Sequence, residues 1–323
     1  MPALAIVTSD RPLVQPLQHR AMNAHLSIEC PSFQKTDRKL ARKVAEDTGG
    51  DAAMHRHTRL LLAKGALAEI QSVINEARTF HREHTSPWED GGLRILSSMM
   101  YPVYMPKMNE FKARFDAAAD KFEPVYPALM EQAKPLLGDA WNEADYPHPL
   151  RIRSRFSFGV RLANMPASDD FRCPDIGADE EERIRRDLDE RNKAALDGVV
   201  RDLWTQMNEH VTHMVDRLVA YEEREDRRGK DEADLSDRTG FFRDTLVTNL
   251  RDLVERLPML NLTGDPQIEQ MRQRMIATLC VHDPEDLRKS PLTRRHVLDQ
   301  AKVIQSAVMQ QAEAIGAAVS ELI

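Results

Sequence analysis

One stretch of the chain, residues 179–228, constrains the possible folds more than any other. It contains no proline, and its apolar residues recur at steps of three and four. This spacing is the period of an α-helix, and a seam sustained over so many residues is typical of long, coiled-coil-like helices. As one helix it would span about 75 Å. Because a single helix cannot bury such a seam alone, other helices must lie along it.

The apolar arc of this helix is widest near its middle. Trp204 and Val215 flank the seam there, so the arc is broader than one neighbouring helix would cover. An exposed apolar arc of this kind indicates an interface. We therefore expect the helix to contact a protein partner or a second copy of the chain through Leu203, Trp204, Met207, Val211, Met214 and Val215.

The composition supports an extended helical protein. Apolar residues make up 41% of the 323 residues and charged residues 30%, while glycine occurs only 13 times. This balance is typical of long helical assemblies. The net charge of −7 argues against a surface built wholly for nucleic acid.

Two features indicate a cytoplasmic protein. The sequence has no apolar run long enough for a membrane span, and its first residues lack the basic and apolar parts of a signal peptide. Its three cysteines, Cys30, Cys173 and Cys280, are odd in number and far apart. This fits reduced thiols and excludes a CxxC metal or redox motif.

Several other segments have helical patterns. The pattern over residues 106–137 passes through Pro124 and Pro127 without a change of register, so it predicts one kinked helix that ends at Gly138. Polar residues followed by proline predict three helix starts, at Pro266, Pro284 and Pro291. Further helices are expected at residues 35–47, 57–82, 93–101, 241–257 and along the C-terminal segment, and the charged segment 222–238 is expected to be a solvated tip.

Alternating apolar residues predict strands at residues 25–30 and 150–162, and residues 171–173 are a candidate partner strand. Because a lone strand is unstable, these strands should share one small antiparallel sheet. The sequence thus predicts a mainly α protein with long antiparallel helices and one small antiparallel sheet. Its expected parts are a loose arm at residues 1–24, a helical hairpin with the sheet at 25–178, and a long-helix bundle at 179–323.

Arginines alternate with apolar residues along the strand expected at residues 150–162. On an extended strand they would share one face, where they could contact phosphates or an acidic partner. The simpler alternative is the hydrated face of an antiparallel sheet. Basic residues of the neighbouring helix could add to this face, so the candidate contact residues are Arg151, Arg153, Arg155, Arg161, Lys35, Arg38 and Arg42.

Little in the sequence indicates catalysis. No phosphate-binding loop, nucleophile elbow, dinucleotide fingerprint or HExxH metal motif is present. Histidine pairs occur at His55/His57, His81/His84 and His210/His213, but no third metal ligand accompanies any pair. Polar residues on helix faces explain these pairs as well, so neither a metal, a cofactor nor an enzymatic activity is expected.

Three short motifs carry a resemblance to a known family: TSPWEDGGLRIL at residues 85–96, ADYP at 144–147 and DFR at 170–172. Together they resemble an uncharacterised domain family of phage and mobile-element proteins. Members are often encoded near a MoxR/CobS-type AAA+ ATPase and a CobT-like von Willebrand protein. The resemblance runs from about residue 25 to about residue 220. It implies an accessory in an ATPase-driven system and supplies no catalytic residues.

Two functional hypotheses follow. The first is a non-enzymatic helical scaffold or adaptor of a phage or mobile element, which binds a protein partner such as an AAA+ ATPase. The alternative is an accessory protein that binds nucleic acid through the arginine-bearing strand. The net charge of −7 and the absence of aromatic residues among the arginines favour the first hypothesis.

Overall fold

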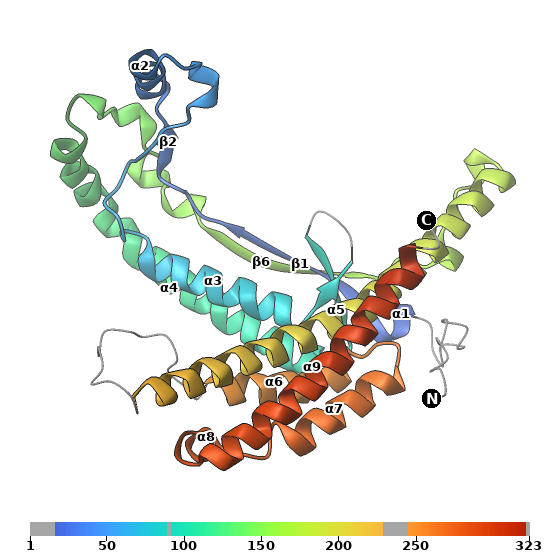
Figure 1. Cartoon of the computed structure of the whole chain (residues 1–323). Helices are drawn as coiled ribbons and strands as arrows, with labels where there is room; N and C mark the ends of the chain where they lie inside the picture. The colour runs from blue at the N-terminus through green and yellow to red at the C-terminus, as the bar shows by residue number, and fades with distance from the viewer. Residues whose placement is uncertain (1–16, 89–91, 229–244, 321–323) are drawn as a thin grey trace. The chain divides into compact units, whose positions relative to one another are not determined.

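A computed structural model describes residues 17–88, 92–228 and 245–320 (Figure 1). Over these ranges the chain forms nine α-helices, a four-stranded sheet and a two-stranded sheet. The predicted mainly α fold with a small antiparallel sheet is therefore confirmed. None of the described helices is long and apolar enough to cross a membrane.

The chain divides into two compact units that are each discontinuous in sequence. Unit 1 comprises residues 1–24, 84–101 and 163–323, and unit 2 comprises residues 25–83 and 102–162. This division differs from the three consecutive parts expected from the sequence. The chain passes from one unit to the other four times. Each crossing lies at or next to the end of an element expected from the sequence, but a local pattern does not show which elements share a unit. The expected arm is also shorter, because residues 17–24 belong to α1 (Leu17–Arg20) and β1 (Ala21–Glu29).

Unit 1 is built on the long helix α5 (Ala178–Arg228), which confirms the helix predicted from the apolar seam. Helices α6 (Thr245–Leu260) and α9 (Pro291–Ser320) pack along it, as Figure 1 shows. Helix α7 (Pro266–Thr278) packs on α6 and α9, and the short helix α8 (Pro284–Lys289) packs on α9. The expected charged tip begins inside α5, and its residues 229–238 lie outside the described residues.

The helix starts predicted at proline are confirmed. Each of α7, α8 and α9 begins at the proline, which needs no backbone hydrogen bond at the first helical position. The carboxylate of Asp265 accepts a hydrogen bond from Gln267 N at 2.8 Å. The hydroxyl of Ser290 accepts one from Thr293 N at 3.3 Å. These side chains satisfy amide groups that a helix start leaves free.

Unit 2 is organised on α4 (Tyr101–Leu137), a single helix with prolines at positions 106, 124, 127 and 135. All four prolines are exposed, so the carbonyl groups that lose a partner can bond to water. The predicted continuity through the prolines and the end at Gly138, where φ is +51°, are confirmed. The buried face of α4 is aromatic and packs on Phe156 and Phe158 through Phe115 and Phe122.

Two other helices belong to unit 2: α2 (Arg38–Thr48) and α3 (Ala68–Glu83). Strands β2 (Gln34–Thr36) and β3 (Thr58–Leu60) pair antiparallel, with Lys35 opposite Arg59. The four-stranded sheet has the order β4–β5–β1–β6. Strands β4 (Ser86–Pro87) and β5 (Leu93–Ser97) belong to unit 1, and β1 and β6 (Ser157–Asn164) contain residues of both units. Short 3-10 turns lie at Ala52–Met54, Gly138–Ala140, Glu143–Asp145, Pro149–Arg151, Arg153–Arg155, Ser168–Asp170 and Pro174–Ile176.

Several local predictions were wrong. The helix expected at residues 57–82 is strand β3 followed by α3, because the chain turns at Gly65 with φ +94°. The helix expected at residues 93–101 begins instead as strand β5, which pairs with β4. The strand expected at residues 171–173 lies between two 3-10 turns. The segments 93–101 and 171–173 were too short for their period to separate helix from strand, and the helix expected at 57–82 was extended too far toward its N-terminus.

Candidate partner-binding surface

The predicted row of arginines on one strand face does not exist. Strand β6 begins only at Ser157, and Arg151, Arg153 and Arg155 lie in two consecutive 3-10 turns before it. Only Arg161 lies on the strand. Alternate positions share a face in a strand but not in a 3-10 turn, so the four side chains form no regular row.

Local sequence explains why these residues turn. Pro149 has the backbone angle that a 3-10 turn requires, and the His148 ring nitrogen Nδ1 accepts a hydrogen bond from Leu150 N at 3.2 Å. The hydroxyl of Ser154 then donates to the carbonyl of Arg151 at 2.8 Å. The alternating apolar pattern was misleading because Ile152 is buried from a turn, not from a strand.

Arg153 anchors the turns to α4. Its guanidinium donates to Asp120 at 2.6 Å and to Asp116 at 3.1 Å, and a third bond reaches the carbonyl of Phe156 at 3.3 Å. These hydrogen bonds raise the pKa of Arg153, although desolvation works in the opposite direction. With its donors used inside the unit, Arg153 is a structural residue and not a free contact for a partner.

Arg151, Arg155 and Arg161 are exposed. No carboxylate of the described chain lies within ion-pair distance of any of them. Arg151 and Arg155 line one surface pocket together with Tyr146, Pro147, His148 and Ser154. The structure thus separates the four arginines by role: one anchor, two in a pocket and one on the strand.

Asp145 forms ion pairs with one residue of β2 and one residue of β3. Its carboxylate is only 2% exposed and accepts hydrogen bonds from Lys35 and, at 2.7 Å, from Arg59. The hydrogen bond from Lys35 is the main cause that lowers the pKa of Asp145, and Arg59 adds to it. Arg59 also donates to Asp37 at 3.2 Å. Lys35, a predicted contact residue, is therefore already paired within the chain.

Asp37 continues this network into α2. Its carboxylate accepts hydrogen bonds from the amides of Lys39 at 3.1 Å and Leu40 at 3.0 Å, and so caps the helix. The helix ends at Gly49, where φ is +67°. The predicted helix at residues 35–47 is thus confirmed with shifted bounds, and its first residues belong to β2.

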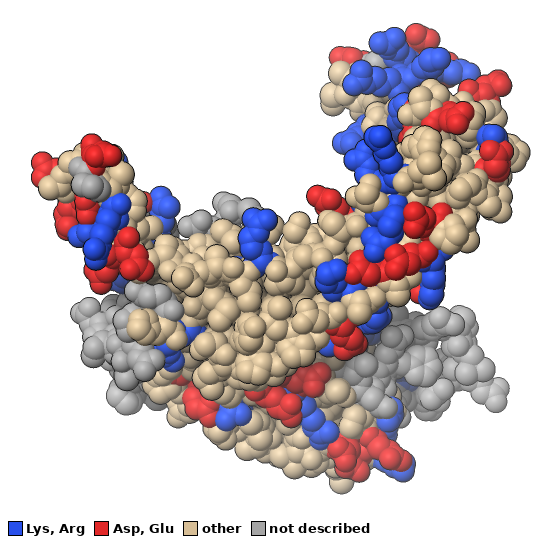
Figure 2. Space-filling view, turned by 180° about the vertical axis from the view of Figure 1, so that it is seen from behind, with Lys and Arg blue, Asp and Glu red and all other residues tan. Residues whose placement is uncertain are grey.

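The segment from β2 to β3, residues 34–60, is called the α2 tip below. Helix α2 buries only Ala41 and Ala45, and its exposed surface carries four cations and the two carboxylates of Glu46 and Asp47. The exposed cations of the α2 tip without an ion-pair partner among the described residues are Arg38, Lys39, Arg42, Lys43 and Arg56. Figure 2 shows Lys and Arg side chains gathered over the end of unit 2 that holds α2.

Large apolar side chains are exposed on the same tip. Met54 is 85% exposed, and Leu40 and Leu60 are each 46% exposed. They come from α2, from the 3-10 turn that packs on it and from β3. The sequence patterns did not indicate these residues, because none belongs to a long apolar stripe.

The charge of the chain is divided unevenly. Unit 2 contains 19 lysines and arginines and 16 aspartates and glutamates, so its net charge is +3. The whole chain has a net charge of −7, which leaves −10 for unit 1. Unit 2 is therefore basic although the chain as a whole is acidic.

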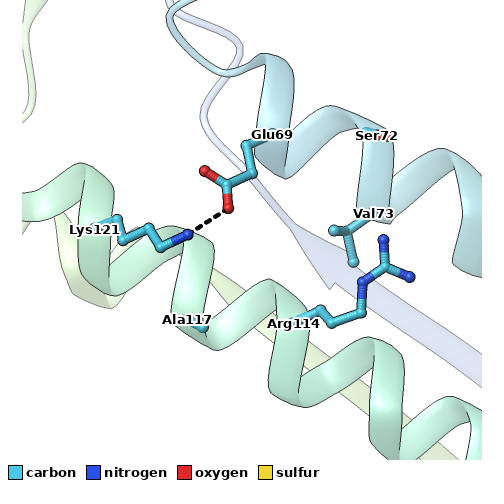
Figure 3. A pocket seen from close by; sticks show the side chains of 6 residues that line it. All are labelled: Glu69, Ser72, Val73, Arg114, Ala117 and Lys121. Carbon is cyan, nitrogen blue, oxygen red and sulfur yellow. Dashed lines mark hydrogen bonds and ion pairs between the residues drawn. The ribbon is translucent and has the colours of Figure 1, made fainter.

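A second surface pocket lies between α3 and α4 and is lined by Glu69, Ser72, Val73, Arg114, Ala117 and Lys121 (Figure 3). Its charges are already paired. Lys121 bonds to Glu69 at 2.8 Å across the helices, and Arg114 bonds to Glu76 at 2.8 and 3.2 Å. These contacts link α3 to α4 and leave no charged group of this pocket free for a ligand.

The wide arc of α5 is not an exposed interface. Its six predicted contact residues have exposed fractions between 0% and 7%, because α6 and α9 of the same chain cover them. The prediction of a partner or a second copy on this face was wrong: two neighbouring helices, rather than one, cover the arc. The residues concerned are Leu203, Trp204, Met207, Val211, Met214 and Val215.

The other polar candidates from the sequence are histidines and cysteines. Among the described residues, no three His, Cys, Asp or Glu side chains are placed to hold a metal ion. His81 Nδ1 lies 2.7 Å from the hydroxyl of Tyr104 in the core of unit 2. Burial raises the pKa of the Cys30 and Cys280 thiols to about 11, which disfavours the reactive thiolate.

Comparison with known proteins gave no relative. No family model, no curated protein and no solved structure matches this chain. Its function must therefore be argued from its own surface.

Proposed function

We propose that this protein is a non-enzymatic adaptor that binds an acidic surface of a protein partner through the α2 tip. The observation that carries the proposal is the exposure of basic and large apolar side chains together on this tip. Leu40, Met54 and Leu60 supply apolar anchors, and Arg38 and Arg42 supply unpaired charge on the same tip. Protein interfaces combine an apolar centre with a polar rim in this way.

The apolar anchors favour a protein over nucleic acid. Phosphate backbones are bound by cations and hydrogen-bond donors, and such binding gains nothing from exposed leucine and methionine. A protein partner can cover these side chains and gain free energy from their burial. The nucleic-acid hypothesis also loses its geometric argument, since the arginines form no row on a strand.

The sequence resemblance supports a specific class of partner. Members of the family that the motifs resemble are encoded near an AAA+ ATPase, so we propose such an ATPase as the partner within a phage or mobile-element system in a bacterial cytoplasm. The basic unit 2 requires an acidic patch on that ATPase. Electrostatic attraction would speed association, while the apolar anchors would slow dissociation.

The proposal is tested by binding to a purified MoxR/CobS-type AAA+ ATPase from the same genome, measured by isothermal titration calorimetry. Leu60→Ala and Arg42→Glu should each weaken binding by about tenfold. Arg161→Glu is the matched control for Arg42→Glu, since it makes the same charge change on an exposed, unpaired arginine outside the tip. This control should change the affinity by less than about threefold.

Three results would contradict the proposal. Equal effects of Arg42→Glu and Arg161→Glu, with none from Leu60→Ala, would show that only overall charge matters. Tight binding of DNA or RNA that Arg42→Glu abolishes and Leu60→Ala leaves unchanged would establish the nucleic-acid alternative instead. The absence of any complex would remove the ATPase as the partner.

A further inference from the structure

We infer that the pocket formed by Tyr146, Pro147, His148, Arg151, Ser154 and Arg155 binds the phosphate group of a phosphorylated small molecule. This site is distinct from the α2 tip and does not depend on the adaptor proposal. Three observations support the phosphate site. Two arginines without an ion-pair partner in the described part of the chain line one pocket, and a histidine lines it as well. The turns that carry these residues are held by hydrogen bonds to the rest of unit 2.

The two guanidinium groups supply the charge. Arg151 and Arg155 are both exposed, both line the pocket, and neither has an ion-pair partner in the described part of the chain. Two like charges at one pocket repel each other in the absence of an anion, so an anion between them is favoured. Arginine forks bind phosphate oxygens with two parallel hydrogen bonds each.

His148 adds a directed donor. Its Nδ1 accepts the hydrogen bond from Leu150 N, so in the neutral ring the proton lies on Nε2. His148 is exposed and lines the same pocket, which leaves Nε2–H available to a ligand. The pocket therefore combines two guanidinium groups with an imidazole N–H donor, a set suited to a phosphate group.

The residues under the pocket hold these donors in position. The hydroxyl of Tyr126 donates to the carbonyl of Pro147 at 3.0 Å, and the hydroxyl of Tyr146 donates to the carbonyl of Leu61 at 2.6 Å. Arg153 ties the intervening turn to α4, as described above. Ordering a loop on binding costs affinity, and a loop already held by its own unit avoids that cost.

The neighbouring acid does not compete with a ligand. Asp145 directly precedes Tyr146, but its carboxylate is buried and bonded to Lys35 and Arg59. The pocket has a volume of about 500 Å³. That is more than inorganic phosphate needs and lies within the range of pockets for small organic ligands. The ligand class is thus a phosphate monoester of about nucleotide size.

The test is calorimetric titration of the full chain with inorganic phosphate, adenosine 5′-monophosphate and adenosine. We expect saturable binding of both phosphate compounds, tighter for the monophosphate, and none of adenosine. Arg151→Gln and Arg155→Gln should each weaken binding by about tenfold or more, because each removes a charged hydrogen-bond donor. Arg155→Lys should restore only part of the affinity, since lysine lacks the planar fork.

Arg161→Gln is the control, as it removes an equal charge outside the pocket and should leave the affinity within about twofold. The inference fails if phosphate and the monophosphate show no saturable binding up to about 1 mM. It also fails if Arg161→Gln weakens binding as much as Arg155→Gln, since the attraction would then be general to the surface. Binding of an oligonucleotide alone, with no response to the monophosphate, would replace the small-molecule site by a nucleic-acid contact. Circular dichroism of each variant checks that the fold is retained.

Discussion

Arg59 and Asp145 lie 86 residues apart in the sequence, yet the guanidinium nitrogen Nη2 of Arg59 donates to the Asp145 carboxylate at 2.7 Å. The contact joins the two-stranded sheet of β2 and β3 to the segment that follows α4. Each of the two residues is also linked to one of the candidate surfaces. Arg59 bonds to the residue that caps α2, and Asp145 precedes the phosphate pocket.

Asp145→Ala should lower the free energy of unfolding by about 2 kcal/mol, because it leaves Arg59 without its closest partner in a half-buried position. Urea unfolding followed by circular dichroism measures this loss of stability.

The contribution of Asp145 to the stability of the wild type also depends on pH. The folded pKa of Asp145 is lowered, so its contribution is complete above the unfolded value of about 3.9 and is lost as pH falls through the folded pKa. Asp145→Ala should lose less stability than the wild type between pH 5 and pH 3, and equal losses would contradict this assignment.

Arg153→Gln should destabilise the protein by about 1 kcal/mol, because its ion pairs with Asp116 and Asp120 are partly exposed. Arg155→Gln, two residues away, should change stability by less than about 0.5 kcal/mol, since it has no such partner within the described chain. Chemical denaturation of the two variants compares them directly. If the two variants lose the same stability, Arg153 is not the structural anchor that its ion pairs indicate.

Leu203→Ala should lower the free energy of unfolding by about 3 kcal/mol, because it creates a cavity where α5 meets the rest of unit 1. Glu209→Ala, exposed on the same helix, should change it by less than about 0.5 kcal/mol. A loss of self-association in Leu203→Ala without a loss of stability would mean that the seam faces another copy of the chain.

Pro124→Ala should raise the free energy of unfolding by about 1 kcal/mol. An interior proline costs a helix about 3 kcal/mol, but alanine makes the unfolded chain freer and the kinked helix does not straighten completely. Pro149→Ala should do the opposite, since Pro149 begins a 3-10 turn where its fixed angle is useful. Thermal unfolding of both variants tests the contrast. A lower melting temperature for Pro124→Ala would indicate that the kink itself is needed for packing.

His210 should make stability fall as the solution becomes mildly acidic. Burial is the main cause that lowers its pKa, and Arg256 and His213 lower it further, while Asp252 acts in the opposite direction. The unfolded chain therefore binds this proton more tightly, so stability declines as pH falls below about 6.5. His210→Gln should flatten the decline between pH 7 and pH 5, whereas His296→Gln, on an exposed residue, should not. An NMR titration that places the His210 pKa above 6.5 would reverse the expectation.

The sequence alone determined the elements with long periods or strong end signals. The seam of α5 and the stripe of α4 run over many turns, and the starts at Pro266, Pro284 and Pro291 depend only on neighbouring residues. A helical period repeated many times cannot be mistaken for a strand, and a cap needs no distant partner.

The tertiary structure alone decided whether short segments form helices, strands or turns, and which charged side chains have a partner within the chain. Residues 93–97 form a strand because β4 lies beside them, and residues 149–155 form turns held by Arg153 and by the capping groups of His148 and Ser154. The same applies to Lys35, which Asp145 binds from 110 residues away, and to the α5 arc, which α6 and α9 cover. These outcomes depend on contacts between residues distant in the sequence, and a local pattern carries no information about which distant residue will supply the contact.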